Sequence, residues 1–299
     1  MLAMLLPDFA LAKERPYEIG GAQQELGRMR ALAERLSKQN LLYQLHLADQ
    51  TKQDLHDTAA EMDRILELLR TGSTTYSVAA PPNAEIREQI EQVDKAWGPV
   101  RRVALASPYD YLRRANEFVP RQNRRGDPFF VHSFDRMTQA LIAEVDRLMT
   151  LYRVECLKTG YDLCEAASNH GMPMMLTERV VKELVLVYTD PDNKSYVKRL
   201  RETREAIEAQ ILALEEMPIS REARDPARGD SGAFVSALWG SIKEDWGRLR
   251  LAVDLAISGR TEEIDLKRVL KTQARVVATW ERIIVVMVRY INAKYAAES

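Results

Sequence analysis

The chain has 299 residues, which is enough for two domains of common size, each with its own core. Its 43 basic and 44 acidic side chains nearly cancel and are interleaved, which argues against a basic nucleic-acid-binding tract and a polybasic membrane patch. Glycine and proline are few, at 13 and 12, and cluster between stretches rich in helix formers, so the composition predicts an all-α fold.

An apolar run, Met1 to Ala12, opens the chain. It ends in Ala10-Leu11-Ala12 before the charged Lys13, which has the form of a secretory cleavage site. A basic segment ahead of the run is missing, so an apolar tail is the alternative. We expect residues 1–12 to be a signal-peptide remnant and the mature protein to be periplasmic. No later run reaches the ~18 to 20 apolar residues that a membrane span needs, so we expect none.

Apolar residues then recur at heptad-like spacing, which predicts a succession of amphipathic helices and no strand. In chain order the stripes are Leu55, Ala59, Met62, Leu66 and Leu69; Ile86, Ile90, Val93, Trp97 and Val100; Met137, Leu141, Glu144/Val145, Leu148 and Tyr152; Val197, Leu200, Ile207, Ile211 and Leu214; Val235, Leu238, Ile242, Trp246, Leu249 and Val253; and Leu266, Val269, Val277, Trp280, Ile284, Met287 and Ile291. Trp97 and Trp246 are expected to anchor the core.

Cys156 and Cys164 are the two cysteines of the chain. On one continuous helix they would lie ~12 Å apart along the axis, which is beyond the reach of a disulfide. We therefore expect two buried thiols, a state that neither supports nor excludes an oxidising compartment.

The second half of the sequence repeats the first in the same order. The matching pairs are Ala33–Lys38 with Thr177–Lys182, Trp97–Arg101 with Trp246–Arg250, and Thr138–Ala140 with Thr272–Ala274. The repeat also locates a turn that composition hides, because the break at Asp190-Pro191 in the second half falls near His46 to Gln50 in the first.

A duplication predicts two domains, at residues 13–157 and 158–299, each an up-down-up-down four-helix bundle. The closing helix of the first would run into the opening helix of the second, with little more than Gly160 and Gly171 to interrupt it. We therefore expect an elongated, rod-like tandem.

The opening helix of the first half carries Gly27, Arg28, Met29, Arg30, Ala31, Leu32, Ala33, Glu34 and Arg35, followed by Lys38. This stretch resembles the N-terminal, PilJ-like domain of type IV pili methyl-accepting chemotaxis transducers, which is related to the input domains of nitrate sensors. Ala31 and Ala33 depart from the family's Met and Ser. The second half keeps Gly171, Met175, Leu176, Arg179 and Lys182 but has Met174 where the first has Arg30.

The resemblance implies a ligand-binding role for Arg30, because nitrate-sensing members use the arginine at this place, typically with its equivalent from a second subunit. A guanidinium fork presents paired donors to a planar oxyanion. Gly27, Arg35 and Lys38 would frame the site, and Arg35 and Lys38 are also candidates for tying helices together. The alternative for Arg30 is an ordinary surface or inter-helix arginine. A homodimer is a possible assembly.

The resemblance favours a periplasmic sensor module that binds a small oxyanion such as nitrate and passes its signal to a protein partner, such as a membrane receptor or a pilus component. The alternative is a helical interaction scaffold without a ligand.

The sequence contains no motif that predicts an enzyme. His46, His56, His132 and His170 form no metal-binding spacing, and no phosphate loop or nucleophile elbow occurs, so no catalytic residue or cofactor is predicted. A lesser alternative is Cu(I) binding through His170, Met172, Met174 and Met175, since soft donors suit that ion. The competing interpretation is that these methionines fill the core.

Overall fold

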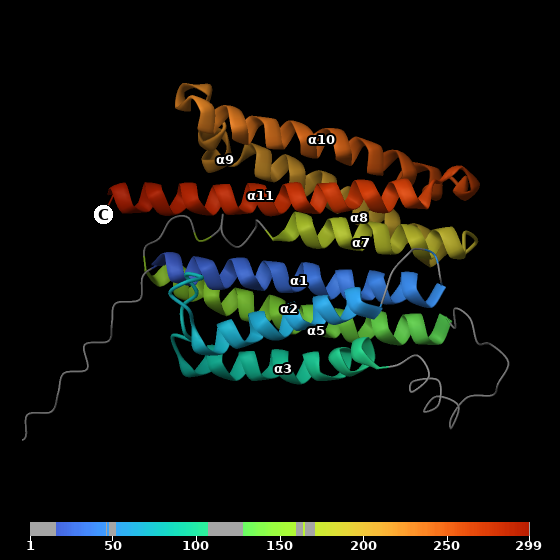
Figure 1. The fold of residues 1–299 in the computed structure, drawn as a ribbon, viewed down its shortest axis with the longest axis horizontal. Helices are drawn as coiled ribbons and strands as arrows, with labels where there is room; N and C mark the ends of the chain where they lie inside the picture. The colour runs from blue at the N-terminus through green and yellow to red at the C-terminus, as the bar shows by residue number, and fades with distance from the viewer. Residues whose placement is uncertain are drawn as a thin grey trace, which may run out of the picture.

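A computed structural model describes residues 16–45, 47, 52–106, 128–159, 164 and 171–298. The first half consists of α1 (Pro16–Leu45), α2 (Lys52–Thr71), α3 (Ala84–Leu105) and α5 (Pro128–Lys158). The second consists of α7 (Met172–Thr189), α8 (Lys194–Glu216), the short α9 (Pro218–Ala223), α10 (Asp230–Ile257) and α11 (Leu266–Glu298), with 3₁₀ turns at Pro226–Arg228 and Thr261–Glu263. These helices run along one long axis of the molecule (Figure 1). The described ranges contain no strand, only an isolated bridge between Ser73 and Val78, so the predicted all-α class is confirmed.

The apolar stripes form the core, as predicted. Every stripe residue predicted on α2, α3 and α10 is buried. Trp97 and Trp246 are 2% and 7% exposed, and the indole Nε1 of Trp97 donates to Asp63 Oδ1 at 2.7 Å. Two helix boundaries also agree with the prediction. α1 ends at Leu45 and α2 begins at Lys52, on either side of the turn expected near residues 46–50.

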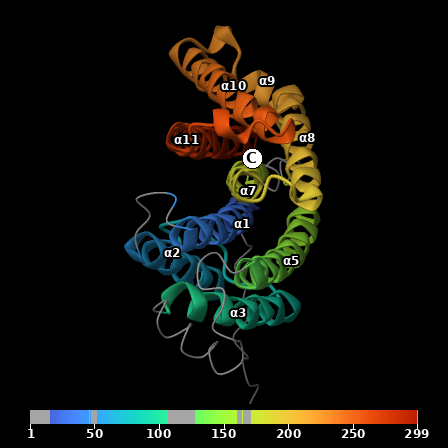
Figure 2. The ribbon, with the colours of Figure 1, turned by 90° about the vertical axis from the view of Figure 1, so that its right-hand side faces the viewer.

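The two halves lie side by side rather than end to end. Within each half the four long helices pack on one another, and the halves meet where α1 packs against α7. Viewed along the helices, α1 and α7 occupy the middle of the molecule, with α5 and α11 on opposite sides of the pair (Figure 2). The expected rod-like continuation of one half into the next is therefore wrong, because α5 ends at Lys158 and α7 packs alongside α1.

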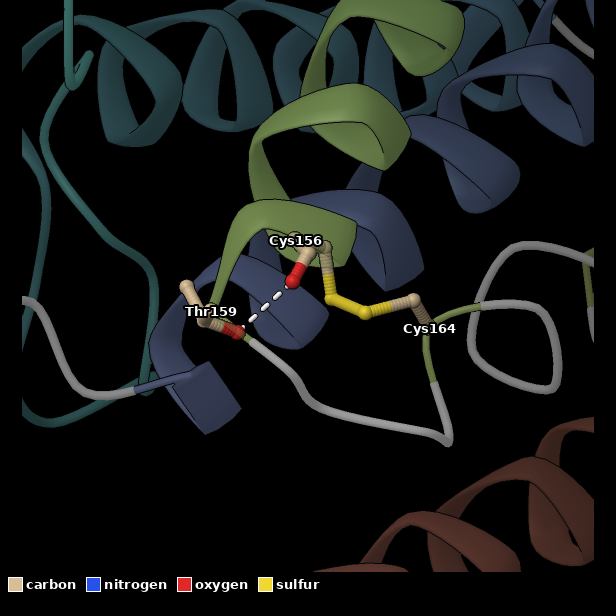
Figure 3. Close-up of a disulfide and its surroundings, with 3 residues drawn as sticks. All are labelled: Cys156, Thr159 and Cys164. Atoms are coloured by element: carbon tan, nitrogen blue, oxygen red, sulfur yellow. Dashed lines mark hydrogen bonds between the residues drawn. A yellow bond between two sulfur atoms is a disulfide. The ribbon is translucent and has the colours of Figure 1, made fainter.

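The expectation of two free thiols is also wrong. Cys156 and Cys164 form a disulfide, with their Cα atoms 5.8 Å apart (Figure 3). The separation of ~12 Å assumed a helix that continues through both residues. Instead the last turn closes at Thr159, whose hydroxyl donates to the carbonyl of Cys156 at 2.6 Å. The end of α5 thus leaves the two sulfurs within bonding distance.

None of the helices in these ranges is both long and apolar enough to cross a membrane. The proposed signal remnant at residues 1–12 lies outside the described residues, as do His46 and His170.

Candidate functional site

Two glycines bring α1 and α7 into backbone contact. A Cβ atom on Gly27 would lie 2.9 Å from the Cα of Gly171, and one on Gly171 would lie 2.4 Å from the Cα of Gly27. No side chain fits in that space. Gly27 and Gly171 are the matching glycines of the repeated segment, so the two opening helices meet at the same position of each half.

Reciprocal ion pairs continue this contact along both helices. On α1, Glu34 accepts from Arg179 Nε and Lys182 Nζ, each at 2.7 Å. On α7, Glu178 accepts from Arg35 Nε at 2.8 Å and Lys38 Nζ at 2.6 Å. Each acid of one helix binds the arginine and lysine of the other at matching positions of the repeat. The pairing requires α1 and α7 to run parallel and in register.

The closing helix of each half extends the network through its repeated glutamine. Gln139 on α5 donates to Glu34 at 2.9 Å, and Lys38 donates to Gln273 on α11 at 2.7 Å. All four helices of the interface thus share one polar layer. The two acids at its centre are closed to solvent, since Glu34 and Glu178 are 0% and 1% exposed. Charges at such depth persist only when they are paired.

The two sides of the layer differ in their number of carboxylates. Lys182 binds Asp135 on α5 at 2.5 Å in addition to Glu34. One helical turn before Gln273, near the corresponding place on α11, the chain has Val269. Among the described residues, Lys38 therefore has one carboxylate within bonding distance where Lys182 has two.

This difference appears in the pKa values of the two lysines. Burial lowers the pKa of Lys38, and its attraction to Glu178 does not restore the usual value. Burial acts in the same direction on Lys182, but Glu34 and Asp135 together raise its pKa above the usual value. The acids behave alike: burial opposes their ionisation, yet the neighbouring lysine and arginine lower the pKa of both Glu34 and Glu178.

Arg30 lies one turn before Glu34 on α1 and is 5% exposed. Its Nη1 donates to Asp146 Oδ1 on α5 at 2.7 Å. Its Nε and Nη2 are buried and have no hydrogen-bond acceptor within the described part of the chain. Gln23, two turns earlier on α1, is also fully buried, with neither side-chain polar atom bonded among those residues. Buried donors without acceptors are costly, so they mark a place where a ligand or water is expected.

All four predicted site residues lie on α1, but their side chains contact different helices. Gly27 meets α7, and Arg35 and Lys38 bind Glu178, whereas Arg30 turns to α5. Sequence reasoning did not assign the acids Glu34 and Glu178 or the glutamines. The sequence repeat could have identified these residues, because each of them lies in a repeated segment.

Two of the methionines proposed for Cu(I) have different surroundings. Met174 lines a cavity beside α11, while the sulfur of Met175 lies 3.8 Å from Arg179 Nη2. Both are buried. Among the described residues no group of three or more His, Cys, Asp or Glu side chains is arranged to hold a metal ion.

Residues 25–118 match the family model described as the N-terminal domain of type IV pili methyl-accepting chemotaxis transducers (PilJ). This part of the chain, which includes α2, α3 and most of α1, is similar to that sensory domain. Neither the curated proteins nor the solved structures contain a significant match to the chain.

Proposed function

We propose that this protein is an extracytoplasmic input module of a chemosensory system, and that Arg30 binds a small oxyanion such as nitrate. The observation that carries the proposal is the state of Arg30: a buried guanidinium with one donor bound to Asp146 and two side-chain nitrogens, Nε and Nη2, without acceptors in the described residues. A planar oxyanion supplies two acceptors in the geometry of that fork.

The free energies of buried hydrogen-bond donors favour a bound anion at Arg30. Each buried donor left without a partner costs about 1 to 3 kcal/mol, and a hydrogen bond to a charged group contributes about 1.5 to 3 kcal/mol. Asp146 balances the charge of Arg30 only in part, because its side chain is 50% exposed and its field is weakened by water. An anion beside Nε and Nη2 would satisfy two donors that have no acceptor among the described residues.

We further propose that residues 13–157 and 158–299 are two copies of one bundle, paired within a single chain. The contact between Gly27 and Gly171 and the reciprocal ion pairs support this pairing. The α1–α7 pair would then take the place of the two opening helices that a pair of subunits contributes. Because Met174 replaces the arginine in the second copy, only the side with Arg30 would bind an oxyanion.

Calorimetry and thermal shift with sodium nitrate, nitrite and chloride test the anion site. Binding to the native state raises the melting temperature by mass action, so nitrate or nitrite should stabilise the wild type. The Arg30→Ala variant should lose this response. Asp146→Asn is the matched control: it removes a nearby negative charge but keeps an oxygen that can accept from Nη1, so binding should be retained or become tighter. An absence of anion binding to the wild type, or unchanged binding to Arg30→Ala, contradicts the anion site.

Export to the periplasm is the third part of the proposal. A structural disulfide such as Cys156–Cys164 is typical of an oxidising compartment. It adds to the cleavage-like sequence Ala10-Leu11-Ala12. N-terminal sequencing of the protein from its native cell should find a mature chain that begins at Lys13 in the periplasmic fraction. A chain that begins at Met1 in the cytoplasm contradicts export.

The second candidate is a protein-interaction scaffold that has lost its ligand. The observation that favours it is the ion pair of Arg30 with Asp146, together with Met174 at the matching position. In that case nitrate and nitrite leave the melting temperature unchanged, and the protein acts through a membrane receptor or a pilus component. Cross-linking in the native cell followed by mass spectrometry would identify such a partner.

A further inference from the structure

A cavity of about 210 Å³ lies between α1, α7 and α11. Figure 2 shows α11 and α5 on opposite sides of the central helix pair. Arg30 binds Asp146 of α5, whereas residues of α11 line the cavity. Met174 forms part of its wall, at the position of the repeat where the first half has Arg30. The two sides of the α1–α7 pair therefore differ in chemistry. The α5 side has the buried guanidinium of Arg30, and the α11 side has the thioether of Met174 and the cavity.

One wall of the cavity is aliphatic and partly open to water. Ile284, Val285 and Val288 of α11 line it, and Val285 is 40% exposed. An exposed valine next to a concave surface offers apolar area that a ligand can cover. An engineered apolar cavity of ~150 Å³ holds one benzene molecule, so this space is large enough for one ring and a short substituent.

The charges around the cavity favour a cation. Arg28, its one basic lining residue, is held by Glu61 at 2.9 Å. Of the two lining acids, Glu25 has Arg64 at 3.4 Å and Glu281 has Arg35 at 4.0 Å. Burial raises the pKa of Glu25, and the attraction of Arg28 and Arg64 only partly offsets this effect. The lining thus carries two acids and one arginine, and that arginine has its shorter ion pair with Glu61.

We propose that this cavity binds a small organic cation: an apolar body of about one ring lies against Met174 and Ile284, and an ammonium group faces Glu25 and Glu281. The site is separate from the oxyanion site at Arg30 and does not depend on it. The ligand class follows from the aliphatic wall, the methionine and the two weakly bound carboxylates.

Isothermal calorimetry with three compounds of similar shape tests the proposal: 2-phenylethylamine, 2-phenylethanol and phenylacetate. The amine should bind the full chain tightest, and phenylacetate at least about tenfold more weakly, as expected for loss of a charge-assisted contact. Glu25→Gln should reduce the preference for the amine over the alcohol while leaving alcohol binding nearly unchanged.

Val285→Trp, at the partly exposed rim, should block all three compounds by filling the mouth of the cavity while the chain stays folded. Arg30→Ala should leave amine binding unchanged, which separates this site from the oxyanion site. Failure of the amine to bind, equal binding of amine and carboxylate, or amine binding that survives Val285→Trp would each overturn the proposal.

Discussion

The acids Glu34 and Glu178 are the residues on which the two halves depend most. Both lie at the centre of the α1–α7 contact, and each binds an arginine and a lysine of the opposite helix. Removal of one partner from a buried pair typically costs about 3 to 5 kcal/mol, because the other charge remains buried. Their neighbours differ, however, so the same substitution should have unequal effects on the two sides.

Glu178→Gln should destabilise the protein more than Glu34→Gln does. Glu178→Gln leaves Lys38 with amide oxygens and no carboxylate among the described residues, whereas Lys182 still binds Asp135 in Glu34→Gln. We expect a loss near the upper end of about 3 to 5 kcal/mol for Glu178→Gln and a smaller loss for Glu34→Gln. Urea unfolding followed by circular dichroism measures both. Equal losses would show that Asp135 does not support Lys182.

The pH dependence of stability should differ between the wild type and Glu34→Gln. Although burial opposes it, Lys182 and Arg179 lower the pKa of Glu34 in the folded state, so the unfolded state binds more protons in acid. Stabilisation by Glu34 is therefore complete above its usual pKa of 4.5 and is lost as pH falls through the lower, folded value. The difference in unfolding free energy between the two proteins should shrink from pH 7 to pH 3. A difference that stays constant over this range contradicts the assignment.

At the scale of the element, the parallel pairing of α1 and α7 depends on two glycines. Gly27→Ala places a methyl group against the backbone of Gly171, which cannot move aside as a flexible side chain would. We expect a loss of at least about 2 kcal/mol, as for overpacking in a core. Gly240→Ala on α10 is the control: nothing lies within 4 Å of its added Cβ, so it should stabilise by about 0.5 to 1 kcal/mol. Thermal unfolding of both variants gives the comparison, and a neutral Gly27→Ala would count against close pairing.

The disulfide at the end of α5 should stabilise the fold by about 2 to 3 kcal/mol, the amount expected for a short closed loop. Its two cysteines are eight positions apart. Cys156→Ser, or reduction of the wild type, should lower the unfolding free energy by that amount. A reductant that leaves the wild type unaffected would indicate that the bond is absent in solution.

Helices that present one face to the core could be predicted from their apolar periodicity, and α2, α3 and α10 are of this kind. The central helices α1 and α7 were harder to predict, because some of their buried residues are charged and periodicity assigns charged residues to solvent. These residues are Glu34, Lys38, Glu178 and Lys182. The repeat identified these segments, but it did not reveal that they pair. The disulfide was missed because the end of α5 is set by a local turn at Thr159.

At the scale of the whole molecule, α1 and α7 form the central interface between the two halves of one chain. The halves lie side by side about the α1–α7 pair, and every polar contact described across it joins matching positions or their neighbours in the repeat. The resemblance to sensor input domains implied a homodimer with one ligand between two subunits. Under the internal pairing proposed above, we expect instead one oxyanion site per chain, at Arg30.

The binding stoichiometry of nitrate tests this claim most directly. Light scattering would establish the mass in solution, and calorimetry on the same sample would give the number of anions bound for each 34.2 kDa chain. We predict a monomer that binds one nitrate or nitrite ion, with binding lost in Arg30→Ala. One anion for every two chains, formed only in a dimer, would contradict the internal pair, and no binding in either state would contradict the sensor function.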